Sequence, residues 1–236
     1  MSDQATAAIH PNEPPLPCPS DIRPSALTPD AQTRIGDLRF RRLVGAKAWL
    51  ILPPAVRHRF SKRLEGGRTV VYVGRTTEMY MTRAGFALAH VARLIGGPLP
   101  VSRHADLPSI VTVTEDMATG GQIWTRLYAH NSGFPQVIHS SKRFAGPTGL
   151  EEHVGCGIAM ALRVETSDTA LIFKSDHYFI QLGRFRLALP SWLSPGHLTV
   201  GHHEIDPENF AFTLDLVHPL LGHLIHQRAV FREATS

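Results

Sequence analysis

The chain has 236 residues, of which 43% are hydrophobic and 19% are charged. This composition is that of a globular protein with an ordinary core, and it excludes a wholly disordered chain. The net charge of +4 is mildly basic. A charge of this size does not indicate a nucleic-acid partner, so we expect none.

The N-terminal segment differs in composition from the rest of the chain. Seven of the 18 prolines fall within the first 30 residues, where the hydrophobic residues show no periodicity. Such a segment cannot bury enough apolar surface to offset the entropy of ordering it. We therefore predict a disordered, proline-rich leader over residues 1–36 and a single globular, β-rich domain over residues 37–233. The leader can alternatively act as a ligand for a proline-recognising partner.

Three features of the sequence predict a soluble, cytoplasmic protein. The chain begins Met-Ser-Asp-Gln, without the basic and apolar stretches of a secretory signal. The most apolar helix candidate contains Arg83, His90 and Arg93, so we expect no membrane span. A disulfide between Cys18 and Cys156 would tie the leader to the interior, which instead favours two free thiols in a reducing compartment.

Helical patterns dominate the beginning of the predicted domain. Apolar residues from Leu38 to Leu50 fall on one helical face, and Pro53-Pro54 ends that helix and begins a second one. The second helix ends before Gly66-Gly67, and residues 68–73 are typical of a first strand.

A third helix is predicted over residues 78–95, with Thr77 as its N-cap, Glu78 in its first turn and a stop at residues 96–98. The 3.6-residue period places one apolar stripe toward the core. That stripe would consist of Phe86, His90, Val91, Leu94 and Ile95.

The remainder of the chain reads as a series of strands. Residues 118–121, Ala-Thr-Gly-Gly, are a strong hairpin signal between two apolar runs. The predicted strands cover residues 110–115, 122–130, 136–144, 156–164, 170–182, 198–205, 209–217 and 223–232. Consecutive antiparallel strands avoid exposed edges by closing or curling around a helix. We predict a β-dominated α+β fold: a curved antiparallel sheet or up-and-down β-barrel with N-terminal helices and a helix between the first and second strands. A two-sheet sandwich is the alternative.

Several short motifs recur in this order in one protein family. They are Gly121–Tyr128, Gly149–Glu151, Leu189–Leu193, Glu204, Phe210–Phe212 and Pro219–Leu224. On these motifs the chain, from about Phe40 to Phe231, resembles the bacterial family catalogued as domain of unknown function 4166.

The resemblance implies little chemistry, because the family has no established activity. Some relatives carry the domain attached to a nucleotide-binding, oxidoreductase-like domain, which suggests an oxidoreductase-like protein as a partner. This chain departs from the family near its end, where a Tyr-x-Gly pattern is replaced by Gln227-Arg228-Ala229. A function that depends on that tyrosine would be absent here.

Trp124, Arg126 and Tyr128 form the first candidate ligand site, because period-two alternation places all three on one face of a strand. An indole can hold a guanidinium by a cation–π contact while the guanidinium donors face an anion. The same three residues can equally form a structural stack that closes one end of a barrel.

His202 and Glu204 form the second candidate, since they follow Leu198 and Val200 on one strand face. A carboxylate in phase with core residues must be paired, protonated or directed into a cavity. The imidazole of His202, next to Glu204, can perform acid–base chemistry. An ion pair between Glu204 and an arginine is the simpler interpretation. His177 is a further candidate. It is in phase with Leu171 on another predicted strand, so its side chain is expected to face the same interior.

We expect no cofactor and no metal. Gly155-Cys156-Gly157 resembles the start of a dinucleotide fingerprint, but Met160 replaces the third glycine and the pattern continues as a strand. The histidines lack helical zinc-binding spacing. Residues 34–68 hold ten Lys and Arg against two acids. Such a run is most often a solvated helical face, and binding to anionic lipid or nucleic acid is a minor alternative.

Three functions remain open at this point. The first is binding of a small apolar or amphipathic molecule inside the barrel or sheet, with Arg126 or Glu204 fixing its polar end. The second is a cofactor-independent isomerase or cyclase that uses Glu204 and His202. The third is an interaction module for an oxidoreductase partner.

Removing the leader should leave the stability of the domain unchanged, because its composition gives it nothing to pack against. Limited proteolysis is expected to trim the chain to about residue 30–38, and the trimmed protein should melt at the temperature of the full chain. A drop of several degrees would show that the leader docks on the domain.

Overall fold

The computed structural model describes residues 36–64, 66, 68–130 and 133–234. The described residues belong to one compact unit that begins at Gly36. Residues 1–35 of the predicted leader, with Cys18, lie outside them. No helix in the described ranges is long and apolar enough to cross a membrane.

Short helices come first and strands follow, as the sequence predicts. The helices and 3-10 helices are α2 (Arg39–Val44), α3 (Ala46–Ile51), α4 (Pro54–Phe60), α5 (Arg83–Ala92), η2 (Arg93–Ile95) and η3 (Ser191–Leu193). The first six strands are β1 (Thr69–Met81), β2 (Pro108–Asp116), β3 (Gly121–Tyr128), β4 (Gln136–Arg143), β5 (Glu151–Gly155) and β6 (Ile158–Thr166). The others are β7 (Ala170–Leu182), β8 (Phe185–Ala188), β9 (His197–Glu204), β10 (Asn209–His218) and β11 (Gly222–Glu233).

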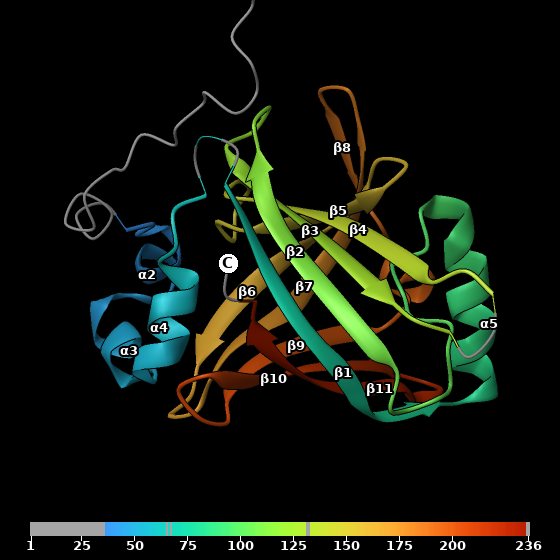
Figure 1. The fold of residues 1–236 in the computed structure, drawn as a ribbon. Coiled ribbons are helices and arrows are strands. Elements are labelled where there is room, and N and C mark those ends of the chain that lie inside the picture. Colours follow the sequence, from blue (N-terminus) through green and yellow to red (C-terminus); the bar gives the residue numbers. More distant parts are fainter. Residues whose placement is uncertain (1–35, 65, 67, 131–132, 235–236) are drawn as a thin grey trace, which may run out of the picture. The chain divides into compact units, whose positions relative to one another are not determined.

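Ten of these strands close into an antiparallel barrel (Figure 1). Their order is β6-β5-β4-β3-β2-β1-β11-β10-β9-β7, and β6 also pairs with β7. Each barrel strand therefore lies beside its neighbour in the chain, with β8 as a hairpin appended to β7. Closure leaves the barrel strands without an unpaired edge. The predicted β-dominated α+β fold is confirmed in its barrel form, with N-terminal helices and a helix between the first two strands.

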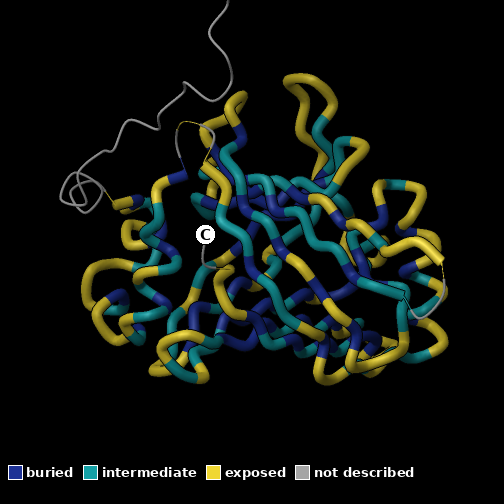
Figure 2. Tube along the Cα trace, in the orientation of Figure 1, coloured by how far each residue is buried: buried dark blue, intermediate teal, exposed yellow. Residues whose placement is uncertain are grey.

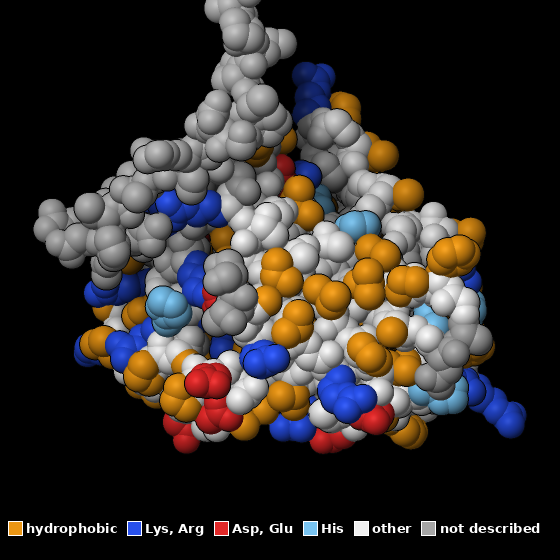
Figure 3. All heavy atoms as spheres, in the orientation of Figure 1, with side chains coloured by type: hydrophobic (Ala, Val, Ile, Leu, Met, Phe, Trp, Pro, Cys, Tyr) orange, Lys and Arg blue, Asp and Glu red, His pale blue; other side chains and the backbone are white. Residues whose placement is uncertain are grey.

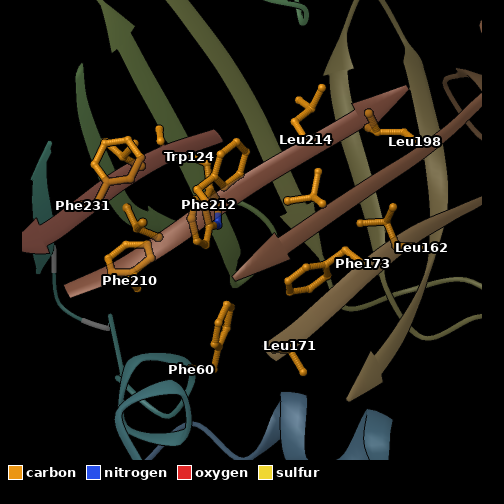
Figure 4. Close-up of a cluster of buried hydrophobic side chains, with 14 of the residues drawn as sticks. Phe60, Trp124, Leu162, Leu171, Phe173, Leu198, Phe210, Phe212, Leu214 and Phe231 are labelled. Atoms are coloured by element: carbon orange, nitrogen blue, oxygen red, sulfur yellow. The ribbon is translucent and has the colours of Figure 1, made fainter. Parts of the chain in front are cut away.

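Helices α2, α3 and α4 cover one end of the barrel. Phe40, Trp49, Val56 and Phe60 project inward from them and are buried. The Phe60 ring lies 5.1 Å from that of Phe40 and 5.7 Å from that of Phe173 on β7. Figure 4 shows Phe60 directed toward the aromatic and aliphatic side chains of the strands. This end of the barrel is thus filled with side chains.

Helix α5 lies at the other end of the barrel and differs from its prediction. It begins at Arg83, and Thr82 caps it by accepting a hydrogen bond from the Gly85 amide at 3.0 Å. The preceding residues continue β1, because cross-strand pairing with β11 overrides their helical pattern.

The buried stripe of α5 is also different from the predicted one. Gly85, Ala89 and Ala92 face the barrel, whereas Val91 and Leu94 are exposed. A Cβ atom on Gly85 would lie only 2.3 Å from the Leu224 carbonyl oxygen. The close approach of the helix to β11 therefore requires glycine at position 85.

Two strand predictions were wrong in detail. Cys156 is exposed and lies in the turn between β5 and β6 with a φ of +47°, so that β6 begins two residues later at Ile158. The short strands β5 and β8 have too few residues to show a recognisable alternation, and neither was predicted. Figure 2 shows that buried and half-buried residues follow the strands, while exposed ones concentrate at the turns.

Replacing Phe60 with Ala should destabilise the domain by about 3–5 kcal/mol, because the cavity it leaves is bounded by a closed barrel that cannot collapse into it. Leu50, exposed on the neighbouring helix α3, is the matched control, and Leu50→Ala should change stability by less than about 0.5 kcal/mol. Urea unfolding measures both. Equal effects of the two substitutions would show that the helices are not part of the core.

Candidate functional site

A cavity of about 500 Å³ occupies the part of the barrel next to α5. Its wall is mostly apolar and includes Leu88, Ile138, Met160, Val200, Phe212 and Leu214. It reaches the surface where the exposed residues Val91, Leu193 and Leu221 line it. Cavities of this volume with apolar walls are the usual binding sites of small molecules.

Arg126 on β3 and Glu152 on β5 line the same cavity and bring charge into it. Nη2 of Arg126 lies 3.4 Å from Oε1 of Glu152, and Nη1 donates to the Ser140 hydroxyl at 3.1 Å. The two charged side chains are only 12% and 7% exposed. A carboxylate and a guanidinium are therefore paired at one polar region of an otherwise apolar wall.

Lys142 on β4 is the third charged residue of this polar region. Its Nζ donates to Oε2 of Glu152 at 2.7 Å, and the side chain is 2% exposed. The same Nζ lies 5.1 Å from the centre of the Trp124 ring and 5.4 Å from that of Phe173. An ammonium over aromatic faces gains a cation–π attraction, which partly replaces lost hydration. Glu152 is thus held between two cations.

The electrostatics of the three charges follow from burial and proximity. Burial alone would raise the pKa of Glu152, but Lys142 and Arg126 outweigh it and lower that pKa to about 2. Burial lowers the pKa of Lys142, and the Glu152 carboxylate opposes this shift. Glu152 is therefore ionised at neutral pH, when it stabilises both cations.

Two tyrosines accompany the charges. Tyr128, next along β3, and Tyr178 on β7 both line the cavity. Burial raises the pKa of Tyr128, and it raises that of Tyr178 to about 12. Both phenols therefore keep their protons at neutral pH and can donate hydrogen bonds to a ligand.

Trp124 lies deeper in the barrel than Arg126, next to the helical end. Together with Arg126 and Tyr128 it lines a second, small cavity of about 10 Å³. Its indole Nε1 donates to Gln122 at 3.2 Å. The three residues predicted to share one face of this strand are therefore brought together inside the barrel.

His202 lines the small cavity too and is enclosed by aromatic rings. Its ring centre lies 5.0 Å from that of Phe60, 5.5 Å from Phe212 and 5.6 Å from Trp124. Burial, with smaller effects from nearby cations, lowers the pKa of His202 well below its ordinary value. Nδ1 of this ring is buried without a hydrogen-bond partner among the described residues. His202 is therefore neutral.

Glu204 and His177 lie apart from the large cavity. Glu204 is half-buried at the helical end of β9, where its charge interacts with Arg59 of α4. His177 follows a bulge at Asp176, where Ala161 pairs with His177 and the next residue, Leu162, pairs with Ser175. The extra residue shifts the alternation by one, so that Tyr178 and Ile180 line the cavity, and His177 Nδ1 instead lies 2.8 Å from Asp176.

Sequence reasoning missed Glu152 and Lys142. Lys142 has the same phase as Ile138 and Ser140, which is a signal that period-two analysis of β4 offers. Glu152 gives no such signal, because β5 has five residues and Leu150, Glu151 and Glu152 are all buried in succession. Gln227, in place of the family tyrosine, is buried, and its Nε2 lies 3.4 Å from the Thr76 hydroxyl oxygen.

Asp215, His223 and His226 form the one group among the described residues with metal-ligand spacing. They lie on β10 and β11, and Oδ1 of Asp215 is 3.0 Å from His223 Nε2 and 2.8 Å from His226 Nδ1. These distances are those of hydrogen bonds from two rings to one carboxylate oxygen. Hydrogen bonding therefore accounts for the cluster without an ion.

The fold and cavity define a class of protein: a closed, antiparallel β-barrel with one helix-filled end and an internal cavity at the other. Residues 52–231 match the model of the family described as a domain of unknown function, DUF4166. The chain belongs to this family. A comparison with curated proteins finds no match.

Replacing Glu152 with Gln should destabilise the barrel by about 3–5 kcal/mol, because it leaves Lys142 and Arg126 buried without their shared carboxylate. The control is Glu165→Gln, which removes an exposed partner of Lys174 and should change stability by less than about 1 kcal/mol. Chemical denaturation at neutral pH measures both. If Glu152→Gln destabilises the protein no more than the control does, the ion cluster does not contribute to the stability of the barrel.

The same variant tests the pH dependence of stability. The pKa of Glu152 is depressed to about 2 from an ordinary value of 4.5. Its contribution to stability is therefore fully present above that ordinary value and is lost as the pH falls toward about 2. Glu152→Gln should flatten this acid limb of the stability profile. If the variant loses stability at acid pH to the same extent as the wild type, protonation of Glu152 is not the cause of that loss.

Proposed function

We propose that this protein binds a small amphipathic molecule, with its apolar body in the barrel cavity and an anionic end at Arg126. The observation that carries the proposal is the combination of an apolar cavity of about 500 Å³ with a cationic polar region in its wall. Barrels of about this strand number can enclose one small ligand.

The charge balance of the polar region favours an anion. Arg126 and Lys142 are two cations against the single carboxylate of Glu152. His202 is neutral and adds no charge. An uncompensated charge in a low-dielectric interior is unfavourable, so a ligand carboxylate, phosphate or sulfate would complete the pairing.

Arg126 is the residue that can bind this anion. Lys142 holds Glu152 at 2.7 Å, whereas the contact from Arg126 to Glu152 is longer, at 3.4 Å. Within the described residues, the guanidinium makes one further hydrogen bond, to Ser140. Arginine has five donors in a planar fork suited to oxyanions, which leaves donors for a ligand. Tyr128 and Tyr178 would supply additional hydrogen bonds.

The other functions named from the sequence have less support. A cofactor-independent isomerase or cyclase would need His202 and Glu204 to reach one substrate. His202 lines the small cavity, and Glu204 is not among the residues lining either cavity. An interaction module for an oxidoreductase-like protein rests on the arrangement of relatives. Both functions therefore have less structural support than ligand binding.

We also propose a cytoplasmic location. Cys156 is free and exposed in a turn, and an exposed thiol persists best in a reducing compartment.

The decisive experiment compares decanoate with decanol, which share an apolar chain and differ in charge. Calorimetry should show saturable, one-to-one binding of decanoate to the wild-type protein. Arg126→Gln should weaken decanoate binding at least about tenfold, which corresponds to about 1.4 kcal/mol, and leave decanol binding unchanged. This variant should fold, because Lys142 still neutralises Glu152.

A second variant tests the cavity itself. Ala92 lines the cavity from α5, and Ala92→Phe should fill space there and weaken both probes. Binding that survives Ala92→Phe would place the ligand elsewhere. Equal effects of Arg126→Gln on both probes would remove Arg126 from the polar end, and an absence of binding to either probe would contradict the function.

A further inference from the structure

Large apolar side chains surround the mouth of the cavity and point into solvent. Phe134, Leu220, Leu94 and Trp192 are 95%, 89%, 82% and 79% exposed. Val91 and Leu221, also exposed, line the cavity at the same end. We call these six residues the mouth patch. Exposed apolar groups gathered around the opening of a cavity mark an interaction site.

The mouth patch draws on four separate segments of the chain. Leu94 follows α5, and Phe134 lies in the β3–β4 loop, which borders the same hollow as Arg93 and Gly97. Trp192 belongs to η3, directly before Leu193 of the cavity lining, and Leu220 belongs to the β10–β11 turn. These segments converge only because the barrel brings its α5-end loops together.

The segments that contribute the mouth patch contain basic residues and no acidic ones. Residues 79–105, 117–150, 177–203 and 216–232, which contain the patch, include no Asp or Glu. Arg83 opens α5, Arg93 follows it in η2, and Arg103 lies over the Phe86 ring of α5; all three are exposed. In Figure 3 hydrophobic and basic side chains are visible around α5 at the right-hand end, and acidic ones lie mainly along the lower edge.

Glu78, Asp106 and Asp215, which border two of these segments in the chain, are already paired. Glu78 lies 3.5 Å from both Arg228 and His226, and Asp215 contacts His223 and His226. Asp106 lies 3.0 Å from Arg75. The exposed field at the mouth is therefore positive.

From this arrangement we propose that the mouth patch docks on an anionic lipid surface, where the barrel takes up or releases its ligand. The inference rests on the proposed function for its purpose, although docking itself needs no ligand. Apolar side chains with a tryptophan insert at the interface of a bilayer, and surrounding arginines are attracted to anionic headgroups. An amphipathic ligand leaving the cavity would then enter the bilayer without crossing water. The continuity of the patch with the cavity lining favours lipid over a protein partner.

Trp192 provides a direct reporter. The sequence has three tryptophans, and the other two, Trp49 and Trp124, are buried. Vesicles of phosphatidylcholine mixed with phosphatidylglycerol should shift the emission of the full chain to the blue and sediment with the protein. Phosphatidylcholine alone should do neither to the same extent. High salt should reverse binding, because it screens the attraction of the arginines.

Leu94→Asp should weaken vesicle binding at least about tenfold. Leu50→Asp is the matched control, since Leu50 is an exposed helical leucine at the opposite end of the barrel, and it should bind vesicles like the wild type. Ala92→Phe, which fills the cavity, should also dock normally. Docking is overturned if anionic vesicles leave the wild type unbound, or if the Leu50 and Leu94 variants lose binding equally. Decanoate binding that persists in Leu94→Asp would then leave the proposed function standing.

Discussion

The pairing of Glu152 with Lys142 and Arg126 is the interaction on which the interior of this barrel depends. The three side chains come from β5, β4 and β3, so the ion cluster joins three neighbouring strands from inside. None of the three charges could be buried alone without a large desolvation cost. Because one carboxylate serves two cations, the cluster also leaves a positive charge facing an apolar space. The same interaction therefore joins the strands and, in the proposed function, favours an anionic ligand.

The two ends of the barrel use side-chain size in opposite ways. At one end Phe40 and Phe60 fill the interior and contact Phe173. At the other end α5 presents Gly85, Ala89 and Ala92 to the barrel. Gly85 allows the helix to lie close to β11, and the two alanines extend little into the interior. Protein interiors are normally packed densely, so an unfilled space of about 500 Å³ is unusual. Small residues on α5 and aliphatic residues on the strands leave it open.

Sequence periodicity predicted the barrel and part of the cavity lining for the same physical reason. Trp124, Arg126 and Tyr128 lie on one inner face because β3 is regular over its length. The bulge at Asp176 breaks that regularity in β7, and no pattern in the neighbouring sequence predicts the bulge. The start of α5 was misplaced because residues up to Met81 pair with β11, more than a hundred residues away. Glu152 could not be found from a five-residue strand. Its role depends on partners from two other strands.

The central claim is that an amphipathic anion occupies the α5 half of the barrel, and methyl NMR during a decanoate titration tests it most directly. We predict saturable one-to-one shifts of the methyl groups of Ile138, Val200 and Leu214, which line the cavity, with those of Val56 in the helical end unchanged. Shifts that fail to saturate, or that are confined to exposed methyl groups, would contradict the account.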